Sequence, residues 1–292
     1  ISEDNYPYSG KLYKFPDAKS LFIYLSNKLL YQILKDAFNS KVLKKRDCWN
    51  VSYAYKKWGE LEMSRSHMIK NPPNRFLADP FLYKKNGFYY CFLENFDYSA
   101  NKGEISAYKI SKSKNEFLGH ALTEDFHLSF PYIFEVAGDL FMIPESHERK
   151  QIRLYKCINF PLGWELEKVL IDNICAADTV VFYKEKLWWM LTNTDPLLSG
   201  DHQSELSIFY SEDILTKDWK PHKLNPIFID PARARNGGLF RDGNALFRVS
   251  QKHGFCTYGQ SANINRIKTI NEDFYEEEFI GSIKPSFLKN IK

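Results

Sequence analysis

Residues 79–94 read DPFLYKKNGFYYCFLE, and the pattern of this stretch returns three more times along the chain. It aligns without gaps on FPYIFEVAGDLFMIPE at 130–145 and on DTVVFYKEKLWWMLTN at 178–193. With one extra residue near the turn it also aligns on RNGGLFRDGNALFRVSQ at 235–251. In these copies, runs rich in Phe, Tyr, Val, Leu and Ile flank a short turn segment, which is typical of a β-hairpin.

A more polar strand follows each hairpin, at residues 103–110, 152–157, 206–211 and 263–270. Multi-stranded units that repeat every ~40–60 residues are the sequence pattern of a β-propeller, in which each blade buries its faces against its neighbours. Four copies are visible in the sequence. A fifth blade is expected from the strands after Tyr258 together with an N-terminal strand at 49–55, which would tie the two ends of the chain together. The predicted fold class is therefore all-β, a five-bladed β-propeller.

The propeller is predicted to occupy residues 47–292, after an N-terminal helical segment at 1–46. Within that segment, apolar residues recur at helical steps over about 17–45 (Phe22, Leu25, Leu29, Ile33 and Phe38). We expect the apolar face to pack against the main domain. The alternative is contact with an acidic membrane surface through a basic face formed by Lys28, Lys35, Lys41, Lys44 and Lys45.

Composition excludes several classes of protein. The chain has 292 residues and a net charge of only +4, with acidic residues scattered among the basic ones, so no nucleic-acid partner is expected. Five widely spaced cysteines predict neither a disulfide framework nor a zinc site, and the histidines show no metal-ligand spacing. No apolar run approaches the ~20 residues that a transmembrane helix needs, and the first thirty residues lack the charged-then-apolar order of a signal peptide. We expect a cytoplasmic protein, with peripheral contact at the inner face of a membrane as the further option.

The repeat also predicts where the chemistry lies, because equivalent residues of a propeller's inner strands point to equivalent places around its axis. One set of equivalent positions holds Asp79, Phe130, Asp178 and Arg235, and a second set holds Glu94, Glu145, Asn193 and Gln251. We expect these side chains to ring one mouth of the central channel. Carboxyl groups held close together push their pKa values apart, so an acid and a carboxylate can coexist there. The alternative for each single residue is a turn cap or a solvated strand end.

At this point the residues carry a family resemblance. The motifs that carry it are, in chain order, Asp79-Pro-Phe, Gly103-Glu104-Ile105, Pro144-Glu145-Ser, Phe160-Pro-x-x-Trp164, Trp219-x-Pro-His222 and Arg248-x-x-Gln251. Over about residues 49–280 the chain resembles the N-terminal domain of plant glucosamine inositolphosphorylceramide transferases and bacterial relatives found with polysaccharide-assembly genes. More distantly it is similar to five-bladed arabinanase-, xylosidase- and invertase-type glycosidases.

The glycosidase resemblance implies roles for three carboxyl groups. Asp79 would be the base or nucleophile, Asp178 the carboxylate that orients the sugar or tunes pKa values, and Glu145 the acid. The acid of arabinanase-like enzymes comes from a later blade, where this chain has Arg235 and Gln251 instead. That departure argues against ordinary hydrolysis.

Further side chains are candidates for substrate binding. The planar fork of Arg235, with Arg233 beside it, suits a phosphate, although Arg235 could instead neutralise Asp79 or Glu145. Aromatic faces can stack on sugars or fill the space between blades. The full set of substrate-binding candidates is Glu94, Glu104, Asn193, Arg233, Arg235, Gln251, Trp188 and Tyr258.

Together these features predict a glycosyltransferase of cell-surface polysaccharide or glycolipid assembly. It would move a sugar, a phosphorylated furanose being one candidate, from a donor activated by phosphate or diphosphate to a glycan or glycolipid acceptor. A divalent metal could bridge carboxylates and phosphates, but no coordination pattern in the sequence requires one. A glycoside hydrolase and a non-catalytic glycan-binding module are the alternatives.

Overall fold

Each of the four sequence repeats forms an antiparallel hairpin in the computed structural model, which describes residues 17–37, 48–60, 66–254 and 257–284. The first turn places Asn86 and Gly87 at φ 51° and 79°, and the second places Ala137 and Gly138 at 51° and 88°. Positive φ at both central residues matches the right-handed twist of the flanking strands. The Asn-Gly and Ala-Gly pairs therefore form the tight turns that the alignment predicts.

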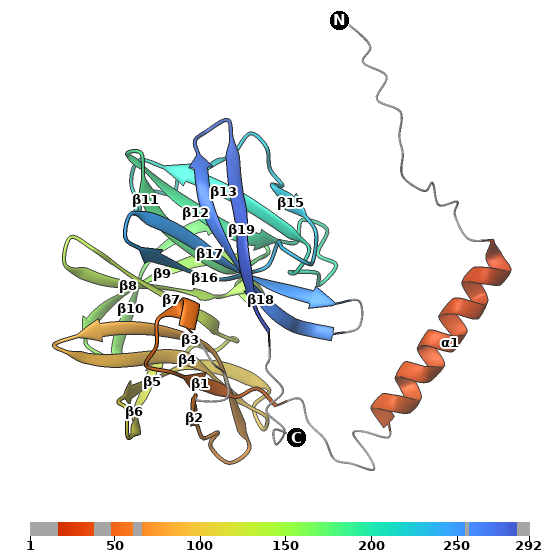
Figure 1. The fold of residues 1–292 in the computed structure, drawn as a ribbon, viewed down its shortest axis with the longest axis horizontal. Coiled ribbons are helices and arrows are strands. Elements are labelled where there is room, and N and C mark those ends of the chain that lie inside the picture. Colours follow the sequence, from red (N-terminus) through yellow and green to blue (C-terminus); the bar gives the residue numbers. More distant parts are fainter. Residues whose placement is uncertain (1–16, 38–47, 61–65, 255–256, 285–292) are drawn as a thin grey trace, which may run out of the picture. The chain divides into compact units, whose positions relative to one another are not determined.

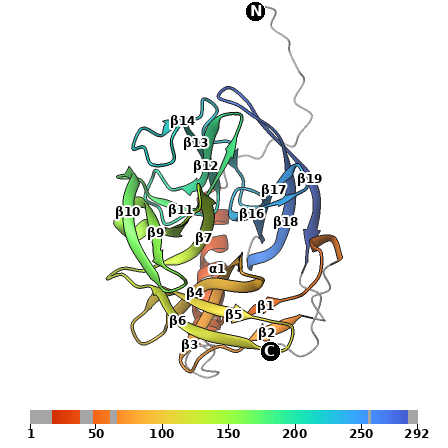
Figure 2. The same cartoon turned by 90° about the vertical axis from the view of Figure 1, so that its left-hand side faces the viewer.

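Each hairpin begins a larger antiparallel sheet, and Figure 2 shows the four sheets following one another around a ring. The first is β3 (Arg75–Lys85), β4 (Phe88–Asp97), β5 (Lys102–Ile110) and β6 (Asn115–Leu122). The second is β7 (Ser129–Val136), β8 (Asp139–Glu145), β9 (Gln151–Asn159) and β10 (Gly163–Asp172), with the short helix η4 (His147–Arg149) between β8 and β9. The third is β11 (Ala176–Lys184), β12 (Leu187–Thr194), β13 (Glu205–Ser211) and β14 (Lys220–Pro221), with β15 (Phe228–Ile229) also paired to β13. The fourth is β16 (Asn236–Asp242), β17 (Ala245–Gly254), β18 (Thr257–Ile270) and β19 (Tyr275–Ile283).

The predicted fifth blade is not formed in the described residues, so the expectation of five blades is wrong. The N-terminal strand β1 (Val51–Tyr53) pairs with β2 (His67–Ile69), and the short helix η2 (Trp58–Glu60) lies between them in the chain. The strand β18 has β17 on one side and β19 on the other, and β1 pairs with β2 rather than with the edge strand β19, so the N-terminal and C-terminal strands share no sheet in the described residues. The propeller fold itself is confirmed, with four large sheets and one two-stranded ladder.

Side-chain contacts rather than a shared sheet connect residues 49–60 to the last sheet. The Trp58 ring packs on Phe240 and Phe247, each at 5.5 Å between centroids, and Trp49 meets Tyr258 edge-on at 5.6 Å. The ladder also packs on the first sheet, because Val51 and Ile69 share a buried cluster with residues of β3, β4 and β5. Residues 49–60 therefore contact the last sheet, and the β1–β2 ladder contacts the first.

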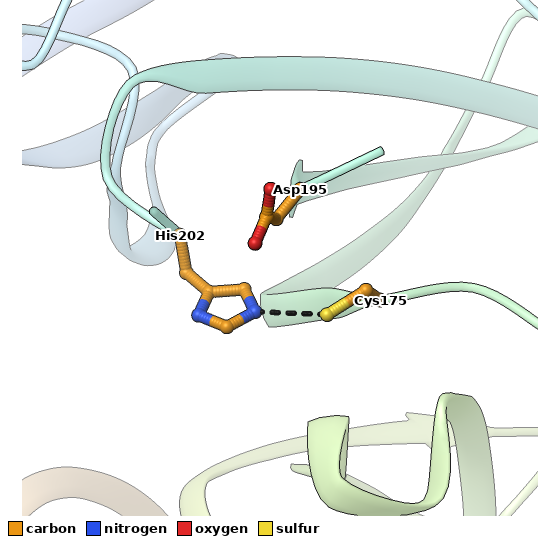
Figure 3. A group of neighbouring side chains, drawn as sticks. All are labelled: Cys175, Asp195 and His202. Atoms are coloured by element: carbon orange, nitrogen blue, oxygen red, sulfur yellow. Dashed lines mark hydrogen bonds between the residues drawn. The ribbon is translucent and has the colours of Figure 1, made fainter. Parts of the chain in front are cut away.

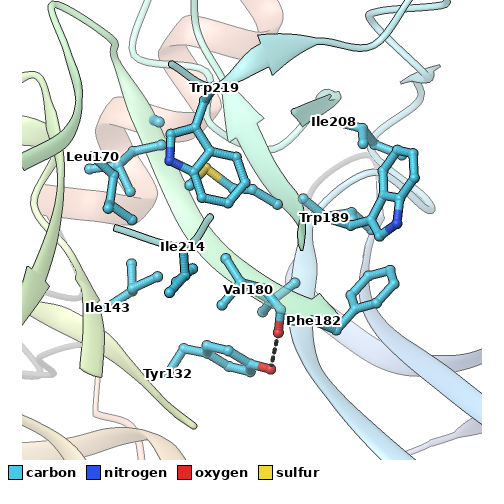
Figure 4. Packing of buried hydrophobic residues seen from close by; sticks show 14 of the residues in the cluster. Tyr132, Ile143, Leu170, Val180, Phe182, Trp189, Ile208, Ile214 and Trp219 are labelled. Atoms are coloured by element: carbon cyan, nitrogen blue, oxygen red, sulfur yellow. Dashed lines mark hydrogen bonds between the residues drawn. The ribbon is translucent and has the colours of Figure 1, made fainter. Parts of the chain in front are cut away.

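The buried apolar residues lie mainly between neighbouring sheets. In Figure 4 the side chains of Tyr132 and Ile143 from the second sheet lie on the side of Val180 from the third, and all three belong to one buried cluster. The Tyr132 hydroxyl donates a hydrogen bond of 2.7 Å to the Val181 carbonyl, so the one polar atom of this contact has a partner. Packing between sheets fixes the position of each inner strand, and with it the position of the side chains at the centre.

The predicted helix is confirmed for α1 (Ala18–Ala37), which belongs to a separate compact unit of the chain (Figure 1). Asp17 caps it by accepting hydrogen bonds from the backbone N–H of Ser20 at 2.8 Å and from its hydroxyl at 2.9 Å. The rest of the predicted helical stretch, residues 38–45, lies outside the described residues, and its packing on the propeller stays a prediction. Within the described residues, no helix is long and apolar enough to cross a membrane.

Candidate functional site

The inner strands of the first three large sheets carry the same local irregularity. The pairing of β3, β7 and β11 with the next strand shifts register immediately around Asp79, Phe130 and Asp178. These three residues have φ values of 47°, 45° and 51°, a left-handed conformation that costs about 1–3 kcal/mol for a residue with a side chain. A β-bulge of this kind re-aims a side chain relative to the regular strand. Three bulges at equivalent positions therefore turn three side chains toward the centre of the ring.

The equivalent bulge in the fourth inner strand, β16, contains a glycine with positive φ. Its register shift lies between Asn236 and Gly238, and Gly238 takes φ 125°. A Cβ added to Gly238 would lie 3.4 Å from Phe81 of β3, an ordinary contact, so the positive φ rather than a lack of space favours glycine here. Arg235 lies directly before this strand.

The bulged residues open onto a central cavity of about 200 Å³. Its lining includes six of the residues discussed from sequence: Asp79, Phe130, Asp178, Arg235, Gln251 and Tyr258. The cavity is smaller than the ~300–1,000 Å³ typical of sites for drug-sized ligands. It has room for a single sugar ring or phosphate group, with the rest of a larger ligand outside.

Arg235 is the cation at the centre. Its Nε donates a hydrogen bond of 2.5 Å to Oδ2 of Asp178, and its terminal nitrogen lies 3.8 Å from Oε2 of Glu145. The guanidinium carbon also lies 5.5 Å from the ring centroid of Tyr258. Arg235 therefore neutralises carboxyl groups, with Asp178 and Glu145 as its partners, and phosphate binding by Arg235 stays a prediction.

The surroundings of Asp178 and Glu145 shift the pKa values of these two carboxyl groups in opposite directions. Both are buried, and Oδ1 of Asp178 and Oε2 of Glu145 accept no hydrogen bond from a donor group. Burial raises the pKa of Asp178 well above its usual value, whereas the hydrogen bond from His147 and the charge of Arg235 outweigh burial and lower the pKa of Glu145 to about 2. A carboxyl group with a raised pKa therefore lies beside one with a lowered pKa.

Asp79 is the carboxyl group suited to proton transfer. Burial, opposed by the charge of Arg235, raises its pKa to about 6. It lines the cavity and is only half-buried, so a ligand can reach it. A group with a pKa close to neutrality is effective as a general base, because it is ionised at working pH and still accepts a proton readily.

Glu94 is a further buried carboxyl group that does not line the cavity. It is 6% exposed, and burial together with the charges of Asp79, Glu145 and Asp178 raises its pKa well above the usual value. Oε1 of Glu94 lies 3.6 Å from Nε2 of His127. Because Nδ1 of His127 accepts the Gly103 N–H at 2.9 Å, the ring proton of neutral His127 is on Nε2 and points to Glu94.

His147 is a functional neighbour that the sequence reasoning missed. Its Nδ1 donates to Oε1 of Glu145 at 2.7 Å, and this hydrogen bond raises the pKa of His147. The available signal was its position two residues after Glu145, since residues two apart in extended chain share a face. His127 gave no comparable signal, because it reaches Glu94 across the first sheet.

Five predicted binding residues do not line the cavity: Glu94, described above, and four more. Glu104 pairs with Arg75, and Arg233, 45% exposed, lies over the Phe228 ring at 3.7 Å. Asn193 joins the third sheet to the fourth by accepting the Asn236 N–H at 2.9 Å. Trp188 packs against Tyr183 and Phe134 with centroids 5.5 Å and 6.1 Å away, which is the blade-filling alternative for an aromatic residue.

Metal-binding side chains gather elsewhere. In the described part of the chain, one group of three His, Cys, Asp or Glu residues brings its ligand atoms within 4.8 Å of one another, and it consists of Cys175, Asp195 and His202. The axial carboxyl groups form no such group among the described residues.

Solved structures similar to this chain are carbohydrate-active enzymes. A family 117 glycoside hydrolase produced by the marine bacterium Zobellia galactanivorans matches with a TM-score of 0.55 and 13% identity, over 73% of this chain and 71% of that one. An exo-1,5-alpha-L-arabinanase from a bovine ruminal metagenomic library matches with a TM-score of 0.52 and 11% identity, over 68% and 76%. At such identities the likeness shows the fold alone.

Sequence relatives give a closer relation. Glucosamine inositolphosphorylceramide transferase 1 of Arabidopsis thaliana is 36% identical over 246 residues, covering 82% of this chain and 32% of the relative. The protein of the same name from Oryza sativa subsp. japonica is 37% identical over 212 residues, covering 70% of this chain and 28% of the relative. The chain thus spans about a third of these relatives. Residues 38–286 match the family described as glucosamine inositolphosphorylceramide transferase 1, N-terminal, and the chain belongs to that family.

Proposed function

We propose that the axial cavity catalyses glycosyl transfer in the assembly of a glycolipid or surface polysaccharide. The single observation that carries this proposal is that Asp79, with a pKa of about 6, and the cation Arg235 line the same small cavity. The donor is a sugar activated by phosphate or diphosphate, and the acceptor is a hydroxyl of a glycan or glycolipid. A cytoplasmic location at a membrane face belongs to the same proposal.

Each central residue has a part in the transfer step. Asp79 takes the proton of the acceptor hydroxyl as the acceptor oxygen bonds to the anomeric carbon. The bond from that carbon to the phosphate oxygen breaks, and its electron pair leaves on the phosphate. Arg235 stabilises that developing charge. Asp178 and Glu145 orient Arg235 from behind, and a proton shared between them leaves the pair with one negative charge for Arg235 to balance.

The relatives' printed name, a transferase, supports transfer over hydrolysis. Glycoside hydrolysis is the second candidate, because the solved structures with this fold include glycoside hydrolases. A retaining or inverting hydrolase uses one protonated and one ionised carboxyl group flanking the sugar. Here the protonated Asp178 is bonded to Arg235, which leaves it poorly placed to protonate a leaving oxygen.

A ligand-class comparison tests the proposal. The purified chain is heated alone and with three sets of compounds: phosphorylated sugars, sugar nucleotides and neutral oligosaccharides. We expect the phosphate-bearing sets to raise the unfolding temperature, and Arg235→Gln to remove that shift. An exposed control, Arg149→Gln, should keep it. Stabilisation by neutral oligosaccharides alone, accompanied by their cleavage, would establish the hydrolase instead, and stabilisation without any turnover would establish a binding module.

A further inference from the structure

Three side chains with metal-binding atoms meet at one end of the hairpin β11–β12 (Figure 3). Cys175 directly precedes β11 and Asp195 directly follows β12, and the Asp195 N–H donates to the Cys175 carbonyl at 3.0 Å. The sheet ladder therefore fixes two of the three residues next to each other. His202 comes from the connection to β13, and its Nε2 lies 3.1 Å from the Cys175 sulfur.

The Asp195 carboxylate is held in place before any ligand arrives. Oδ1 accepts hydrogen bonds from the backbone N–H and the hydroxyl of Ser199, both at 3.0 Å, and Oδ2 accepts the Gly200 N–H at 2.7 Å. Asp195 is 3% exposed. A carboxylate offers about four lone-pair positions, so three donors leave one for a further contact. Support of this kind around a ligand is typical of protein metal sites.

The arrangement differs from a nucleophilic Cys–His–Asp triad. In a triad the carboxylate accepts the hydrogen bond of the imidazole nitrogen that does not face the nucleophile. Here both oxygens of Asp195 accept hydrogen bonds from the turn at Ser199 and Gly200. One ligand atom from each of the three residues instead lies within 4.8 Å of the other two.

We propose that Cys175, Asp195 and His202 bind a divalent transition-metal ion of the zinc type. The ligands are the sulfur of Cys175, Nε2 of His202 and one carboxylate oxygen of Asp195. Zinc takes this mixture of thiolate, imidazole and carboxylate in tetrahedral sites, with bonds of ~2.0–2.3 Å. Binding releases the thiol proton to water. A small inward movement of the half-buried Cys175 and His202 side chains brings the ligand atoms to bonding distance. The fourth position stays open to water or a ligand.

The proposed metal site adjoins the axial cavity but shares no residue with it. The His202 ring lies 5.0 Å from the His147 ring between centroids, and His147 is bonded to Glu145. Binding an ion at Cys175, Asp195 and His202 would add a net charge of +1, two from the ion less the thiol proton released, one histidine away from the axial carboxyl groups. The inference does not depend on the proposed transfer reaction, because metal binding is measured without any sugar.

Cobalt titration of the chelator-treated full chain tests this site. We expect one Co²⁺ per chain, with a sulfur-to-cobalt charge-transfer band and the strong visible absorption of a four-coordinate ion, and Zn²⁺ should displace it. Cys175→Ser should lose the sulfur band and weaken binding ~10-fold or more, a loss at the low end of that seen for altered metal sites. His202→Gln should keep the sulfur band and weaken binding by at least as much. Cys157→Ser changes another half-buried thiol and should behave as the unaltered chain.

Two results would overturn the site. One is cobalt binding without a sulfur band, and the other is equal affinity in the unaltered chain and in His202→Gln. Alkylation by iodoacetamide provides a measurement that needs no variant. Saturating Zn²⁺ should slow the modification of Cys175 at least ~10-fold, in line with loss of free thiolate. Modification at the same rate with and without Zn²⁺ would contradict metal binding and identify a free reactive thiol instead.

Discussion

Asp79 and Glu145 are both carboxyl groups at the centre of the ring, yet their surroundings drive their pKa values in opposite directions. Glu145 accepts a hydrogen bond from His147 and faces Arg235, whereas for Asp79 burial outweighs the attraction of Arg235. The repeat in the sequence predicted that carboxyl groups would gather here. It did not predict which of them would be ionised, because that depends on partners such as His147 that lie outside the repeated stretch.

The pH dependence of transfer follows from Asp79. A general base works only when ionised, so the specific rate of transfer should rise with pH through the pKa of Asp79, about 6, and level off above it. Initial rates at low donor concentration between pH 4.5 and 8 measure this. A rate that is flat across that range would exclude Asp79 as the base.

Glu94 gives a prediction for stability. The pKa of Glu94 in the folded protein is raised above the ordinary value of 4.5, so ionising it costs more in the folded than in the unfolded state. The contribution of Glu94 to the free energy of unfolding is therefore full below pH 4.5 and is lost as pH rises. Glu94→Gln removes this loss, and at pH 8 we expect the variant to unfold with a free energy about 1–3 kcal/mol higher than the unaltered chain. At pH 4 the gain should be much smaller. Urea unfolding at both pH values measures the difference.

The control for Glu94 is Glu116→Gln, which changes an exposed carboxyl group paired with Lys114 at 3.7 Å. It should shift stability little at either pH. A gain for Glu94→Gln that is identical at pH 4 and pH 8 would mean that its charge is not the cause.

At the scale of the elements, alternating apolar residues and turn pairs were enough to predict four hairpins. They were not enough to predict the bulges at Asp79, Phe130 and Asp178. Nothing in an Asp-Pro, Phe-Pro or Asp-Thr pair requires a left-handed φ, and packing between the sheets must maintain it. Glu104 belongs to a motif of the family resemblance, Asn193 to the second set of equivalent positions, and Trp188 to the aromatic faces that could stack on sugars. The strands of all three direct them to partners outside the cavity.

The start of β5 offers a test of how tightly the elements meet. A Cβ on Gly103 would lie 2.5 Å from the Leu128 carbonyl oxygen and 2.9 Å from Oε1 of Glu94. Since the backbone of Leu128 cannot turn away, Gly103→Ala should lower the free energy of unfolding by about 1–3 kcal/mol or more. Gly281→Ala in β19 meets nothing within 4 Å and serves as the control. Equal unfolding midpoints for the two variants would contradict the close approach.

At the scale of the whole propeller, the way the ring is completed was predicted incorrectly. A shared fifth blade was expected from strands at both ends of the sequence, because propellers often close in that way. The composition of a strand does not reveal which strand it pairs with, and β1 pairs with β2 rather than with the edge strand β19. Side-chain packing between residues 49–60 and the fourth sheet takes the place of that shared blade.

Trp58 is the residue that tests this packing. It contacts Phe240 and Phe247, and its indole N–H donates to Asp242 at 3.1 Å. Trp58→Ala should lower the free energy of unfolding by about 2 kcal/mol, less than the ~3–5 kcal/mol of a fully buried tryptophan because Trp58 is only half-buried. Leu197→Ala, at a side chain 84% exposed, should change it little. If both variants have the same free energy of unfolding, the packing of Trp58 on the fourth sheet does not stabilise the propeller.

The central proposal is that the axial cavity performs the transfer and that Asp79 is its base. The measurement is the transfer rate of Asp79→Asn at saturating donor and acceptor, made beside the donor affinity of the same protein, with the exposed Asp139→Asn as the control. We expect the rate to fall about 100-fold or more while the donor affinity changes less than about threefold, since removing a general base affects the transition state far more than binding. An Asp79→Asn protein that transfers sugar as fast as the unaltered chain would contradict the claim.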